Sequence, residues 1–111
     1  MPETVHGELI IPADAVPGLA SGVVELRDVA LMDAPAPLVA TLILDRIVVT
    51  PGGTIPFEIT LPHGTAFRTL AVRAQIGAGG TSSLGSGDLL TTIHVPVSTE
   101  VPVRVPLMRL P

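Results

Sequence analysis

The chain contains no cysteine, tyrosine, tryptophan or lysine. Without cysteine it cannot form a disulfide, a thiolate zinc site or a cysteine nucleophile. Phe57 and Phe67 are the two aromatic residues, too few for a platform on which sugars or single-stranded nucleic acids stack. The six basic residues are spread along the chain and the net charge is −4, which argues against a nucleic-acid partner.

Long apolar runs are also missing, because polar residues or prolines interrupt every hydrophobic stretch well short of the roughly 18 residues that span a bilayer. Twelve scattered prolines exclude a helical bundle, since proline breaks the interior of a helix. Hydrophobic residues nevertheless make up 47% of the 111 residues, too many for a disordered chain and enough for one core. We therefore predict a single domain over residues 1–111.

Alternation of apolar and polar residues with a period of two is the dominant pattern, and it predicts half-buried antiparallel strands. The clearest cases are residues 54–61, 69–76 and 101–107. Less regular candidates are residues 5–11, 23–29, 38–49 and 88–97. About seven strands with glycine and proline between them predict an all-β fold, either an antiparallel β-sandwich or a barrel.

Several local features predict where these strands lie. Residues 38–49 form the longest apolar stretch, so we expect a central strand covered on both faces, with a bulge or strand end at Asp45-Arg46. Pro102 and Pro106 fall on one face of the last strand, which predicts a sheet edge with the prolines toward solvent. The turn Pro51-Gly52-Gly53 predicts a hairpin, and the glycine- and serine-rich residues 77–87 predict a flexible loop.

No group of residues has the spacing of a catalytic or metal site. His6, His63 and His94 lack metal-ligand spacing, so we expect exposed histidines, no metal and no cofactor. Asp28 and Asp33 could act as an acid–base pair, but aspartates that cap turns are the favoured interpretation. We predict that the protein is not an enzyme. A small metal-dependent hydrolase using Asp28, Asp33 and a histidine is the alternative.

A series of short motifs follows in order along nearly the whole chain. They lie at residues 12–15, 26–30, 33–36, 55–59, 70–76, 88–92 and 96–99. Together they resemble the YscW-like family, the type III secretion lipoprotein chaperones or pilotins and related small envelope lipoproteins of unknown function. The family-motif positions singled out here are Asp28, Asp33, Pro35, Phe57 and Arg73, which we expect to be structural.

The resemblance implies a small β-sandwich in the periplasm or at the outer membrane. It also implies a non-catalytic function, in which the protein holds an apolar segment of a secretin or another envelope protein on a sheet face or edge. The lipobox cysteine of the family and a signal peptide are both missing from this chain, so a cytoplasmic location stays open. A further alternative is a structural β-sandwich with no chaperone role, forming a weak homodimer through residues 38–49. We expect no nucleic-acid partner and no transmembrane span.

Overall fold

The computed structural model describes residues 4–28, 38–61, 70–77, 88–91, 95–97 and 101–110. These residues form nine strands and no helix. The strands are β1 (Thr4–Ile10), β2 (Gly18–Asp28), β3 (Leu38–Val49), β4 (Thr54–Thr60), β5 (Leu70–Gly77), β6 (Leu89–Leu90), β7 (Val95–Pro96), β8 (Val103–Pro106) and β9 (Met108–Arg109).

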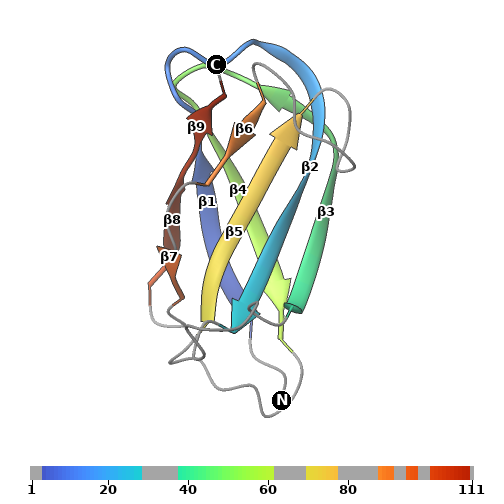
Figure 1. Ribbon diagram of the computed structural model, residues 1–111, viewed down its shortest axis with the longest axis vertical. Coiled ribbons are helices and arrows are strands. Elements are labelled where there is room, and N and C mark those ends of the chain that lie inside the picture. Colours follow the sequence, from blue (N-terminus) through green and yellow to red (C-terminus); the bar gives the residue numbers. More distant parts are fainter. Residues whose placement is uncertain are drawn as a thin grey trace.

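Two sheets stack face to face, so the predicted β-sandwich is confirmed (Figure 1). The smaller sheet has the strand order β4-β1-β8, and the larger has the order β3-β2-β5-β6-β9 with β7 also paired to β5. Every pairing is antiparallel except that of β1 with β8, which is parallel. The alternation in the sequence did not predict this parallel pairing, because side chains alternate with a period of two in both kinds of sheet.

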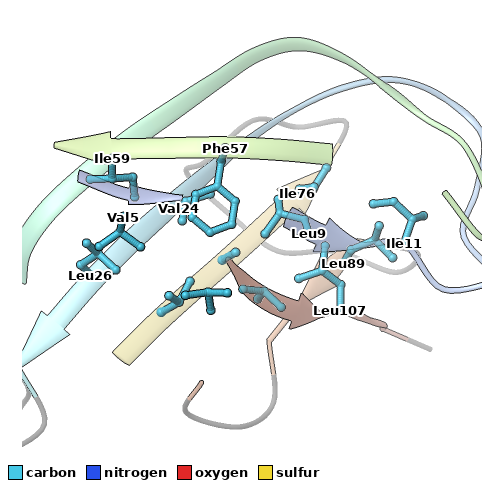
Figure 2. Close-up of a cluster of buried hydrophobic side chains, with 14 of the residues drawn as sticks. Val5, Leu9, Ile11, Val24, Leu26, Phe57, Ile59, Ile76, Leu89 and Leu107 are labelled. Carbon is cyan, nitrogen blue, oxygen red and sulfur yellow. The ribbon is translucent and has the colours of Figure 1, made fainter. Parts of the chain in front are cut away.

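The core lies between the sheets and is filled by aliphatic side chains and one phenylalanine (Figure 2). The smaller sheet contributes Val5, Leu9 and Phe57, which are buried, and the larger sheet contributes Leu26 and Ile76. The predicted alternation is confirmed along β4 and β5: the inward positions are buried except for the half-buried Ile55, while most of the intervening residues are exposed or half-buried. Burial of this apolar surface is the main force that holds the two layers together.

The prediction of a central strand at residues 38–49 was wrong. The strand β3 is the last strand of the larger sheet in the part of the chain that the structure describes. Its inward residues Leu42 and Leu44 pack against the core, while Ile43 and Val48 face solvent. A run of apolar residues shows that both faces of a strand are apolar. It does not show whether another part of the protein covers the second face.

The predicted hairpin at Pro51-Gly52-Gly53 was also wrong, although a tight turn does form there. The Gly53 amide donates to the Thr50 carbonyl at 2.9 Å, and Gly52 has a φ of 77°. The chain then crosses to the other sheet, because β3 belongs to the larger sheet and β4 pairs with β1 in the smaller one. The Ile11 amide donates to the Gly53 carbonyl at 2.9 Å, which ties this turn to the end of β1.

Other local predictions have mixed outcomes. Pro102 and Pro106 are exposed and β8 lies at the edge of the smaller sheet, as predicted. The bulge at Asp45-Arg46 is also confirmed. The expected strand over residues 88–97 is replaced by the short strands β6 and β7, with residues 92–94 outside the described part. The predicted loop lies outside it as well, except for Gly77, the last residue of β5.

Candidate binding surface

The outer face of the smaller sheet is polar. His6 and Glu58 lie opposite each other there, with 3.7 Å between His6 Nδ1 and Glu58 Oε2. In the same way Arg104 Nε lies 3.2 Å from Glu8 Oε1 across the β1–β8 pair. His6, Glu58 and Arg104 are largely in solvent and Glu8 is half-buried, so the pairs contribute little to stability. The charges lie beside the exposed prolines Pro56 and Pro102, which line a shallow hollow on this face.

The outer face of the larger sheet is different, because large apolar side chains are exposed on it. The residues and their exposed fractions are Leu19 70%, Val48 64%, Ile43 60%, Met108 56% and Leu38 51%. The pairing register places Leu19 opposite Val48, and Ile43 opposite Val23. Leu19, Val48 and Ile43 lie near one another on β2 and β3, whereas Leu38 is at the other end of β3 and Met108 is on β9 across the sheet. A group of exposed apolar residues is a mark of an interaction surface, whereas single scattered ones are ordinary.

A cavity of about 180 Å³ opens beside Leu19, at the end of the sandwich where β2 begins and β5 ends. We call it the end pocket. Its apolar lining comes from Val16, Leu19, Val49, Ile76 and Leu89. Of these, Val16 and Leu19 are exposed while Val49, Ile76 and Leu89 are buried. An apolar recess with an exposed apolar rim suits an aliphatic side chain presented by a partner.

The backbone around the end pocket depends on turn residues and glycine. The Ala15 amide donates to the Pro12 carbonyl at 3.2 Å, which closes the turn between β1 and β2. Gly18 has a φ of 141°, a conformation that other residues rarely adopt, and it leads the chain into β2. At the opposite wall, a Cβ atom on Gly77 would lie 2.6 Å from Cγ of Asp88. Glycine at position 77 therefore lets Asp88 approach the end of β5.

The three family-motif positions that the structure describes do not come together in one site. Asp28 is the last residue of β2, and Arg73 is exposed on β5 opposite Glu25. Phe57 is in the core of the other sheet. Asp33 and Pro35 lie outside the described residues. The motif therefore marks positions in separate parts of the sandwich.

The candidate acid–base and metal residues are also separated as far as they are described. His6 is on the outer face of the smaller sheet and Asp28 is in the larger sheet. Asp33, His63 and His94 lie outside the described part of the chain. Within that part, no group of three or more histidines, aspartates or glutamates has the arrangement of a metal site.

Sequence reasoning missed the end pocket. Val16 and Leu19 flank the Pro17-Gly18 pair, and apolar residues beside such a turn can be either buried or exposed. The pocket depends on how four parts of the chain that are distant in the sequence meet, namely residues 16–20, 49, 76–77 and 88–89. No spacing within any one of them could have indicated it.

Among the residues that the structure describes, no helix has the length and hydrophobicity to cross a membrane. No protein-family model and no curated protein matches the sequence. One solved structure is similar, that of an alternative pilotin from the type II secretion system of Vibrio cholerae. The TM-score is 0.68 at 21% sequence identity, over 98% of this chain and 99% of that one.

This chain has a pilotin-like fold. The similarity covers both chains almost completely, so it concerns the whole β-sandwich rather than one motif. The sequence resemblance to the YscW-like family pointed to a type III secretion pilotin, whereas the similar structure comes from a type II system.

Proposed function

We propose that this protein is a non-catalytic, pilotin-like binding module of the bacterial envelope, which holds an apolar segment of a secretin or another envelope protein. The observation that carries the proposal is the full-length similarity in fold to an alternative pilotin. The exposed apolar residues of the larger sheet support it, because a protein that holds an apolar segment needs such a surface. The experiment below tests whether the partner belongs to a type II secretion system or, as for a YscW-like protein, to a type III system.

The end pocket is the proposed anchor point for the partner. Its lining is mostly aliphatic, and Leu19 at its rim is the most exposed large apolar side chain of the described residues. Burial of one leucine-sized side chain contributes about 1.5–3 kcal/mol. Interfaces typically depend on a few such anchors, so one substitution at the rim should weaken binding strongly. We propose that the family-motif positions act structurally, away from this contact.

The test is a calorimetric titration of the purified protein with apolar segments of a type II and a type III secretin from the same organism. We expect one of them to bind, and Leu19→Asp to weaken it at least tenfold, roughly 1.4 kcal/mol. The matched control is Val101→Asp, which changes a residue of similar exposure that does not line the pocket. Equal binding by the wild type and Leu19→Asp would exclude the end pocket. If neither segment bound, the secretin proposal itself would fail.

An envelope location belongs to the same proposal. Cells that make the native protein would be separated into cytoplasmic, periplasmic and outer-membrane fractions. The mass of the protein recovered from each fraction would show whether it is processed or carries a lipid. Recovery of the protein in the cytoplasmic fraction alone would contradict the proposal and would favour the alternative of a structural β-sandwich without a chaperone role.

A further inference from the structure

The strand β3 carries a bulge at Asp45 and Arg46. The register runs from Ala20 opposite Ile47 to Gly22 opposite Leu44, so two residues of β3 face the single residue Ser21. Arg46 has a φ of 53° and is the non-glycine residue with positive φ in the described chain. Glycine is the usual residue in this conformation, because a Cβ atom crowds the backbone there.

The bulge therefore exposes two adjacent residues of opposite charge, Asp45 and Arg46. The Ser21 hydroxyl donates a long hydrogen bond of 3.5 Å to Asp45 Oδ1. Arg46 is exposed and makes no ion pair with any residue in the described ranges. The chain thus holds a guanidinium group in solvent, at a position where arginine is an unfavourable choice for the backbone.

Exposed apolar residues flank the charges at equal distances. Ile43 lies two residues before Asp45, and Val48 lies two residues after Arg46. Both are more than half exposed. The exposed side chains of residues 43–48 therefore follow the order apolar, negative, positive, apolar. The apolar residues are arranged symmetrically about the peptide bond between Asp45 and Arg46, and the two charges on either side of it are opposite.

We propose that this protein forms a two-fold symmetric dimer through β3, with the axis passing beside the Asp45–Arg46 bulge. In a two-fold contact residue i meets residue j and residue j meets residue i. When the two β3 strands run antiparallel, Asp45 of each copy faces Arg46 of the other, and Ile43 faces Val48. The adjacent opposite charges are thus complementary to a second copy of the same segment.

The contact is made by side chains more than by backbone pairing. A bulge on an edge strand bends it away from a neighbour and interrupts any continuous ladder of hydrogen bonds. The buried apolar area at Ile43 and Val48 provides the attraction, and the reciprocal ion pairs determine the register. The two contacts adjoin, because Val48 lies opposite Leu19 and Val49 of the same strand lines the end pocket. Asp45 and Arg46 do not line the pocket, so charge reversals at these positions test the dimer apart from the proposed secretin binding.

Charge reversal gives a sharp test. Sedimentation equilibrium of the wild type should show a monomer–dimer equilibrium, followed by interference optics because the chain has no tyrosine or tryptophan. Asp45→Arg places two positive charges on the bulge and Arg46→Asp places two negative charges there. Each variant alone should dimerise at least about tenfold more weakly, because like charges then face each other. An equimolar mixture of the two should form a heterodimer and recover the affinity.

The matched control is Arg104→Asp, which reverses an exposed arginine on the outer face of the other sheet and should leave the equilibrium unchanged. A wild type that stays monomeric up to about 1 mM would overturn the proposal. So would a dimer that survives both single reversals, or a mixture that fails to recover association while circular dichroism shows both variants folded. Secretin binding is measured separately, so its failure would leave this result intact.

Discussion

The ring of Phe57 occupies the space where a side chain of Gly7 would lie. The two residues face each other across the β1–β4 pair on the core side of the smaller sheet. A Cβ atom on Gly7 would be 2.5 Å from Cζ of Phe57 and 2.7 Å from the carbonyl oxygen of Val103. An aromatic ring that covers a strand glycine supplies the packing that the glycine lacks.

Gly7→Ala should therefore destabilise the protein by about 1–3 kcal/mol, the usual range for an overpacked core. Thermal unfolding followed by circular dichroism would measure the change. Adding Phe57→Leu to this variant should recover only part of the loss, because the contact with the Val103 backbone remains. An unchanged melting temperature for Gly7→Ala would show that the ring moves aside without penalty.

Truncation to alanine should have a large effect on stability at one leucine of the larger sheet and almost none at another. Leu26 is fully buried and Leu38 is half exposed. Leu26→Ala should lower the free energy of unfolding by about 2–5 kcal/mol, because it removes buried methyl groups and leaves a cavity. Leu38→Ala should change it by less than about 0.5 kcal/mol. Urea unfolding of both variants would check the difference, and equal losses would contradict the assignment of the two faces.

Arg46→Gly should stabilise the monomer by about 0.5–1 kcal/mol, because glycine adopts a φ of 53° without the strain that a Cβ atom brings. The same substitution removes one partner of the proposed ion pairs, so dimerisation should weaken. Arg104→Gly is the control, since Arg104 is an exposed arginine in β8 with no positive φ. Glycine there should destabilise the strand. Thermal unfolding at a concentration where both proteins are monomeric would compare them.

Thr91 follows the last residue of β6, and its hydroxyl and amide bind the backbone of β5 there. Thr91 Oγ1 accepts a hydrogen bond from the buried Ala74 amide at 3.3 Å, and the Thr91 amide donates to the Ala74 carbonyl at 3.0 Å. Thr91→Val should cost about 1–3 kcal/mol, because it leaves a buried amide without an acceptor. Thr91→Ser keeps the acceptor and should cost less. A larger loss for serine than for valine in chemical unfolding would contradict this role.

Much of the local structure could be predicted from the sequence. The faces of β4, β5 and β8 follow from alternation alone, since Phe57, Val72 and Val105 are buried where the pattern places them. The exposed prolines of β8 and the bulge at Asp45-Arg46 also follow from local chemistry, because proline lacks an amide hydrogen and charged residues are rarely buried without a partner.

The candidate binding surface could not be predicted in this way. Leu19 and Leu26 are both leucines in β2, yet one is the most exposed large apolar residue described and the other is fully buried. Alternation places the two on opposite faces, because they are seven residues apart in one strand, but it does not show that the face of Leu19 stays uncovered. The end pocket likewise requires segments that are up to about 70 residues apart to meet, which local patterns do not report.

The sequence by itself determined that the chain forms strands, which side chains of the regular strands point inward, and that the fold is all-β, either a sandwich or a barrel. These properties depend on the period of side-chain alternation and on the apolar content, which are local. Only the tertiary structure decided that β3 lies at an edge, that the chain changes sheet between β3 and β4, and that β1 and β8 run parallel. The physical reason is that many strand orders would bury the apolar face of each strand, and the packing of the whole core selects one of them.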